Sequence, residues 1–142
     1  MRYDTAYANC TQVPRTGHGS IDTEHDELLN LATGIQRVPD DEFAAAFDQL
    51  QARFAEHFAS EDALMDTEDF SSRQCHLDEH AAVLQSFEQT SRLLHEGKLL
   101  PARKMARQLI AWLPEHVDAL DRQLAKFLFM RETGGAPILL HR

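Results

Sequence analysis

The stretch FAAAFDQLQARFAEHFASEDAL, residues 43–64, decides the fold, because its hydrophobic positions recur in alternating steps of four and three residues. This spacing predicts an amphipathic α-helix with one face turned toward a core. The inward stripe consists of Phe43, Phe47, Leu50, Phe54, His57, Glu61 and Leu64. Two ionisable side chains therefore stand in register with aromatic ones, where an ordinary helix bundle would carry only apolar residues.

Turn signals separate this helix, which we expect to open at Asp40 or Asp41, from three other periodic segments. The segment before it predicts a helix over residues 21–36, with Ser20 as its N-cap. The dipeptide Val38-Pro39 should end that first helix, because the residue before a proline is disfavoured in the α conformation.

Two further helices follow along the chain. The first of them should start at Ser71 or Ser72, where Ser71 and Gln74 make a possible capping box, and should stop at Gly97. The last should begin with Pro101 at its first position and end before the paired glycines near the C-terminus. Its stripe carries Met105, Leu109, Trp112, His116, Leu120 and Phe127.

Short connections between long helices predict antiparallel neighbours, so the expected fold class is an all-α, up-down-up-down antiparallel four-helix bundle. The 142 residues provide enough chain for one domain with its own core. We expect an N-terminal arm over residues 1–19, the bundle over residues 20–131 and a C-terminal tail over residues 132–142.

Five histidines and two carboxylates occupy the inward stripes of the predicted helices, and they are His25, His57, Glu61, His76, His80, His116 and Asp121. Burying so many ionisable groups is costly unless something binds them, and neutral imidazole and carboxylate are metal ligands. When residues are counted from the turns, the second, third and fourth helices place these groups at the same height along the bundle axis. The run from His25 to Pro39 is shorter than that from Pro39 to His57, so an irregular loop or helix tilt must absorb the difference.

The spacing within the set favours ligation of a shared metal. In two pairs the partners are four residues apart and so share a helix face. The pairs are His57 with Glu61 and His76 with His80. The step from His116 to Asp121 is five residues, about 140° around a regular helix, so the aspartate would have to reach sideways. The alternative is a set of core histidines that hydrogen-bond to carbonyls or carboxylates. Zn or Mn would also suit these residue types.

Four motifs resemble those of the hemerythrins, specifically the single-domain bacterial type, and the resemblance runs from Gly17 to about Phe129. The motifs are IDTEH (residues 21–25), HFASEDALM (57–65), HLDEH (76–80) and WLPEHVDALD (112–121). The five-residue step in the last motif is part of the family pattern. The N-terminal arm departs from that pattern, because residues 9–18 read NCTQVPRTGH in place of the usual aromatic segment.

The resemblance implies a non-haem di-iron centre as the cofactor. The implied ligands of one iron are His76, His80 and His116, those of the other are His25 and His57, and Glu61 and Asp121 bridge the two ions. A bridging oxo or hydroxo group completes the centre. If both irons are six-coordinate, the five imidazoles, the two bridging carboxylates and that oxygen fill every coordination position but one. The open position is on the ion with two histidines.

The resemblance also implies reversible O₂ binding at the open position, in an oxygen carrier, store or sensor. The alternative is a di-iron oxidase, ferroxidase or peroxidase-like enzyme. Carboxylate-rich bundles with such metal sites use Glu-x-x-His motifs, and no histidine of this chain has glutamate three residues before it. We therefore expect a carrier with at most weak peroxidase or oxidase side-activity. Sensing would require a separate protein partner.

Apolar residues in register with the ligands are expected to form a dry pocket around bound O₂. They are Leu28, Leu29, Phe54, Phe58, Trp112, Leu113 and Val117. The same residues would form ordinary bundle core, and both roles can hold at once. The remaining Glu and Asp residues are expected on solvated faces.

The formal net charge of −9 argues against a nucleic-acid or anionic-membrane partner, and no apolar run is long enough to span a bilayer. Neither an apolar leader nor a disulfide framework is evident, which favours a cytoplasmic location. We expect a monomer or weak homo-oligomer. Cys10 and Cys75 should be free, and Cys75 buried or half-buried. We expect His18, His95 and His141 to bind no metal.

Overall fold

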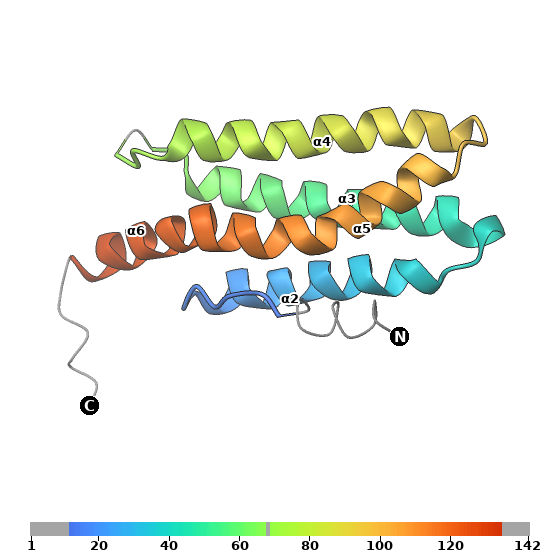
Figure 1. The fold of residues 1–142 in the computed structure, drawn as a ribbon. Coiled ribbons are helices and arrows are strands. Elements are labelled where there is room, and N and C mark those ends of the chain that lie inside the picture. Colours follow the sequence, from blue (N-terminus) through green and yellow to red (C-terminus); the bar gives the residue numbers. More distant parts are fainter. Residues whose placement is uncertain (1–11, 68, 135–142) are drawn as a thin grey trace.

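Four helical segments lie side by side in the computed structural model, which describes residues 12–67 and 69–134 (Figure 1). The first three are α2 (Gly19–Gly34), α3 (Asp40–Leu64) and α4 (Arg73–His95). The fourth is continuous and consists of α5 (Leu100–His116), the π-helical turn η2 (Val117–Asp121) and α6 (Arg122–Thr133). Both α2 and α4 pack against α3 and α5, which closes the bundle. No strand occurs in the described ranges, and the expected all-α four-helix bundle is confirmed.

Within the described residues, the helices extend from Gly19 to Thr133. Residues 1–11, in the expected N-terminal arm, and residues 135–142, in the expected C-terminal tail, lie outside the described residues. The division into arm, bundle and tail stays a prediction.

The first helix begins two residues earlier than expected, and its N-cap is His18 instead of Ser20. Nδ1 of His18 accepts a hydrogen bond from the backbone N–H of Ile21 at 3.4 Å. Ser20 is already inside the first turn, and its hydroxyl lies 3.3 Å from the same ring nitrogen. An imidazole thus fills the place that a serine or aspartate oxygen usually takes.

The connection between α2 and α3 brings their candidate ligands to one height. The 3₁₀ turn η1 (Ile35–Arg37) follows α2, and Val38 and Pro39 are extended. A 3₁₀ turn rises about 2.0 Å per residue against about 1.5 Å in an α-helix, and extended residues rise further. The shorter run from His25 to Pro39 therefore spans enough length, and the expected irregular loop is confirmed.

The capping box predicted for α4 is wrong. The helix begins at Arg73, and its N-cap Ser72 makes no side-chain capping bond. The Ser72 hydroxyl instead donates to Oε1 of Gln123 in α6 at 2.7 Å, and Gln74 bonds within its own helix. At the other end Gly97 has a left-handed φ of 91°, as the predicted helix stop requires.

The fourth segment departs from a regular helix at η2. It begins at Leu100, so Pro101 stands at the second helical position. After His116, the π turn takes one residue more than an α turn and rotates everything that follows. The expected stripe through Leu120 and Phe127 is therefore wrong, because both are only half-buried. From the π turn onward, the buried residues of this segment are Val117, Asp121, Leu124, Ala125 and Leu128.

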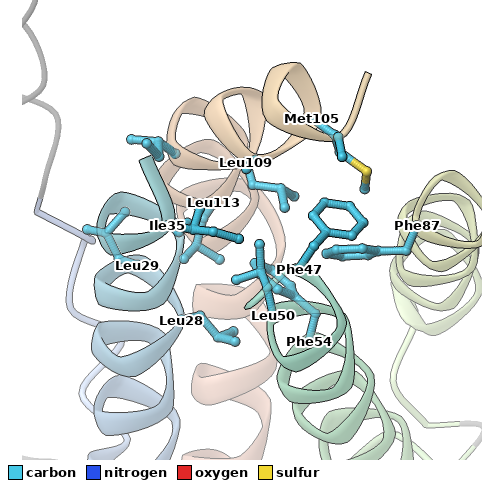
Figure 2. Close-up of a cluster of buried hydrophobic side chains, with 14 of the residues drawn as sticks. Leu28, Leu29, Ile35, Phe47, Leu50, Phe54, Phe87, Met105, Leu109 and Leu113 are labelled. Atoms are coloured by element: carbon cyan, nitrogen blue, oxygen red, sulfur yellow. The ribbon is translucent and has the colours of Figure 1, made fainter. Parts of the chain in front are cut away.

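Two apolar clusters fill the bundle, one on each side of the candidate ligands along the helix stripes. In the larger cluster, Phe87 of α4 contacts Phe47 and Phe54 of α3, with ring centroids 5.5 Å apart in both pairs (Figure 2). The smaller cluster is built from Ile21, Met65, Phe70, Leu124 and Leu128. The candidate ligands therefore form a polar layer between two apolar ones.

The described part of the N-terminal arm is anchored at two points. Val13 is buried in the larger apolar cluster. Asp22 in α2 accepts hydrogen bonds from the backbone N–H of Thr16 at 2.9 Å, from the Thr16 hydroxyl at 2.7 Å and from the N–H of Gly17 at 3.2 Å. The arm thus docks on the bundle without the aromatic segment usual in the family that the sequence resembles.

Candidate metal centre

The seven candidate ligands come from all four helical segments and converge in the polar layer. All are buried, with at most 4% of any residue exposed. Their ligand atoms form two groups, and within each group all atoms lie within 4.8 Å of one another. One group is Glu61, His76, His80, His116 and Asp121, and the other is His25, His57, Glu61 and Asp121. Both carboxylates belong to both groups.

Glu61 presents one oxygen to each group of histidines. Its Oε2 atom lies 2.8 Å from Nε2 of His57 and 3.4 Å from Nε2 of His25. Its Oε1 atom lies 3.4 Å from Nε2 of His76 and 3.3 Å from Nε2 of His80. One carboxylate, carried on α3, thus lies between imidazoles of three different helices.

Asp121 is arranged in the same way on the opposite side. Its Oδ2 atom lies 2.8 Å from Nε2 of His25, while its Oδ1 atom lies 2.7 Å from Nε2 of His76 and 3.1 Å from Nε2 of His116. Together the two carboxylates divide the layer into a half with three imidazoles and a half with two.

The π turn η2 explains how Asp121 reaches this position. Five residues separate it from His116, which in a regular α-helix would place the two side chains about 140° apart. In a π turn the backbone hydrogen bonds join residues i and i+5, so side chains five residues apart come onto roughly one face, as those four apart do in an α-helix. The sideways reach expected of this aspartate is therefore unnecessary.

Nearly all atoms that face the centre lack a hydrogen-bond partner among the described residues, although they lie close together. They are Nε2 of His25, of His57 and of His76, and both carboxylate oxygens of Glu61 and Asp121. A buried polar group left unsatisfied costs about 1–3 kcal/mol. Lone pairs that converge without pairing are the arrangement a bound cation satisfies, so the donor set fits a metal.

Without a metal, the charges of the layer are strongly coupled. Burial alone would lower the pKa of His25 and of His76, but the close carboxylates of Asp121 and Glu61 outweigh it and raise each pKa to about 9. Burial alone would raise the pKa of Glu61 and of Asp121, but the imidazoles around them hold each pKa well below its ordinary value. The metal-free centre therefore holds protons that a metal would displace.

Three half-exposed carboxylates bind the outer ring nitrogens of three of the histidines. The Nδ1 atoms of His57, His80 and His116 lie 2.6, 2.8 and 2.5 Å from carboxylate oxygens of Glu24, Asp62 and Glu79. A carboxylate on Nδ1 favours the tautomer that carries its proton there. The Nε2 lone pair is then free to face the centre, which is the state that a metal needs.

The expectation that all other acidic residues lie on solvated faces is wrong for Asp22, which is buried against the arm. It is also wrong for Glu24, Asp62 and Glu79, which bind the histidines. Each is the chain neighbour of a candidate ligand, and consecutive residues point about 100° apart around a helix. Each carboxylate consequently faces an adjacent helix and meets a histidine there. An acidic residue directly beside a ligand was the sequence signal that could have identified them.

The apolar residues expected to line an O₂ pocket lie in or against the larger cluster. Phe58 stacks on His80 with centroids 4.0 Å apart, and Trp112 stacks on His116 with centroids 4.4 Å apart. These two rings thus cover the half with three imidazoles. Among the others, Leu28, Leu29, Phe54, Leu113 and Val117 are buried. Their role as a ligand pocket stays a prediction.

Among the residues that the structure describes, the two other histidines and the cysteine stand apart from the centre. His18 caps α2, and exposed His95 has its Nε2 3.4 Å from Asp48. Cys75, expected to be buried or half-buried, is exposed, because it points away from the face of α4 that carries its neighbour His76. Cys10 and His141 lie outside the described residues.

Comparison with known proteins places the chain among cation-binding helical proteins. Residues 16–128 match the family described as "Hemerythrin HHE cation binding domain". The chain is 30% identical over 115 residues to a bacteriohemerythrin of Ralstonia nicotianae, an alignment that covers 81% of this chain and 84% of that relative. No solved structure matches the sequence. None of the helices in the described residues is both long and apolar enough to cross a membrane.

Proposed function

The chain belongs to the hemerythrin family of HHE cation-binding domains, and on that premise we propose that it holds two iron ions and binds O₂ reversibly at one of them. It would act as an oxygen carrier, store or sensor and not as an enzyme. Weak peroxidase or oxidase side-activity is compatible with this role.

The observation that carries the proposal is the way Glu61 and Asp121 divide their oxygens. Each carboxylate turns one oxygen toward His25 or His57 and the other toward two of the three remaining histidines. A carboxylate so placed suits a pair of metal ions better than a single one, because each oxygen has its own set of imidazoles.

The two halves of the layer would bind the two ions unequally. We assign His76, His80 and His116 to one iron, His25 and His57 to the other, and Glu61 and Asp121 to both, together with an oxo or hydroxo bridge. The ion with two histidines keeps a position for O₂. When bound, the ferrous pair supplies the two electrons that reversible O₂ binding requires.

The residues of the chain would serve this chemistry in three ways. Glu24, Asp62 and Glu79 hold three imidazoles in one tautomer and orientation. The buried apolar layer excludes bulk water, so a bound ligand is shielded from protonation. The two buried carboxylates offset half of the positive charge of two ferrous ions, which lowers the cost of holding the ions in a core.

The decisive experiment is metal analysis of protein purified from iron-supplied cells, followed by visible spectra of the reduced protein before and after O₂. We expect two irons per chain and a charge-transfer band that appears with O₂ and disappears when O₂ is removed. Irreversible oxidation at first exposure would contradict the carrier and favour the oxidase alternative. Zinc, or no bound metal, would contradict both.

Variants of the assigned ligands test the site itself. We expect His80→Ala or Glu61→Ala to abolish stoichiometric di-iron binding, because each removes a donor from the buried layer. His95→Ala is a matched control, since His95 lies exposed at the end of the same helix as His80. Wild-type iron content in His80→Ala or Glu61→Ala would contradict the assignment.

A further inference from the structure

A small cavity between α2 and α3 lies directly beside the candidate metal centre. Its volume is about 70 Å³, and it is lined by Glu24, Leu28, Arg53, Glu56 and His57. Only 3% of the His57 side chain is exposed, and its Nδ1 is bonded to Glu24. Its Nε2 faces the centre and has no hydrogen-bond partner. The imidazole of His57 thus borders the cavity and belongs to the candidate ligand set as well.

Charged side chains surround this cavity. Arg53 of α3 donates from Nη2 to Oε1 of Glu27 on α2 at 2.5 Å and so spans the two helices. Its Nε atom is 3.5 Å from Oε1 of Glu56 and makes no hydrogen bond. Glu27 and Glu56 lie against this one guanidinium and Glu24 lines the same cavity, so the group carries an excess of negative charge.

A second cavity near the centre has a different character. It is about 160 Å³ in volume, lies between α4 and α5, and is lined by Val83, Ser86, Met105, Gln108, Leu109 and Trp112. No charged residue contributes to it, which suits an apolar molecule better than an ion. The cavity beside His57, by contrast, is lined by four polar or charged residues and one apolar residue.

We propose that the cavity beside His57 is the route by which Fe²⁺ reaches the centre, and that Arg53 closes its mouth. The proposal rests on the proposed function, because it takes the buried metal centre as the destination. Surplus carboxylates raise the local concentration of a divalent cation, as charged clefts do for other ions. Carboxylate oxygens also replace the water that such an ion must shed.

Arg53 and the incoming cation compete for the same carboxylates. While its guanidinium is paired with Glu27, it places a positive charge at the mouth and repels another. Glu24 connects the cavity to the centre, because its carboxylate already touches the ring of His57. Removing the arginine charge should therefore speed metal uptake, and removing a mouth carboxylate should slow it.

The test measures the rate of Co²⁺ uptake by the full-length metal-free protein, followed by stopped-flow through the visible d–d bands. We expect Glu56→Gln to take up Co²⁺ about threefold more slowly and Arg53→Gln about threefold faster at low ionic strength. The double variant should return close to the wild-type rate, and high salt should shrink all differences. The final stoichiometry should stay unchanged, because neither residue is an assigned ligand.

Glu96→Gln and Lys98→Gln are the matched controls, since they change the net charge equally at an exposed pair in the α4–α5 connection. Both should load at the wild-type rate. Equal rates for Glu56→Gln and Glu96→Gln, or wild-type rates in both cavity variants, would overturn the route and leave the metal centre standing. A wild-type protein that takes up no Co²⁺ would overturn the centre and the route together.

Discussion

Glu79 shows how one side chain at the edge of the bundle sets the state of a buried one. Its carboxylate is 41% exposed and lies 2.5 Å from Nδ1 of His116, whose own side chain is 1% exposed. With the proton held on Nδ1, the lone pair of Nε2 faces Oδ1 of Asp121 and the centre. The same relation holds for the two other carboxylate–histidine pairs.

Replacing Glu79 should weaken metal binding without removing a ligand. We expect Glu79→Ala to lower the affinity for Co²⁺ by about tenfold or more, because His116 loses the partner that fixes its tautomer and orientation. Glu79→Gln keeps an acceptor oxygen and should lose less. Competition of the protein with a chelator for Co²⁺ measures both affinities.

Glu88 provides the control for this comparison, because it is an exposed glutamate on the same helix, well away from the candidate ligands. Glu88→Ala should bind Co²⁺ as tightly as the wild type. If Glu79→Ala bound Co²⁺ as tightly as Glu88→Ala, the carboxylate would have no positioning role.

At the scale of one element, α2 depends on the arm that precedes it. Asp22 binds three donors from Thr16 and Gly17, and Val13 is buried beyond them. Burial alone would raise the pKa of Asp22, but these hydrogen bonds lower it below its ordinary value. The ionised carboxylate therefore stabilises the docked arm above its unfolded-state pKa, and this stabilisation is lost as the pH falls through the folded-state pKa.

Asp22→Ala should detach the arm and destabilise the bundle. We expect a loss of about 2 kcal/mol in the free energy of unfolding, because a buried carboxylate with several hydrogen bonds is removed. Urea unfolding of the metal-free protein measures the loss. Asp26→Ala removes only the exposed pair with Arg15 and should cost less than about 1 kcal/mol. Equal losses in the two variants would contradict the anchoring role of Asp22.

At the scale of the whole molecule, the centre makes the stability of the metal-free protein depend on pH, and bound metal should remove that dependence. The pKa of His25 and of His76 in the metal-free protein is raised from 6.5 to about 9. A raised pKa stabilises the folded state fully below pH 6.5, and this contribution is lost as the pH rises to about 9. The free energy of unfolding of the metal-free protein should therefore fall across that window.

Metal loading should cancel the trend, because ligation requires neutral imidazole and releases the protons of these two histidines. The stability gained on loading should grow as the pH rises from 6.5 toward about 9. Urea unfolding of both forms over this range measures the gain, and calorimetry in buffers of different ionisation enthalpy measures the protons released. A gain that shrinks with rising pH would contradict the protonation states derived for the metal-free centre.

The sequence by itself determined the fold class and, up to His116, the faces of the helices that meet in the core. Periodicity belongs to each helix alone, so a stripe with steps of four and three faces the core wherever the helix stays regular. His57 and Glu61 continue the stripe of Phe54 and are buried with it. The ends of the helices were harder to predict from the sequence, because a cap depends on one local hydrogen bond. At the start of α2, the imidazole of His18 makes that bond in place of Ser20.

Only the tertiary structure decided the features that require two helices to meet. Asp121 shares a face with His116 because η2 adopts a π turn, a conformation that is rare in helices and that a regular periodicity does not predict. The pairing of Glu79 with His116 and the exposure of Cys75 depend on how α4 is rotated against its neighbours. Rotation and distance between helix axes are set by side-chain packing across the bundle, and no repeat within a single helix encodes them.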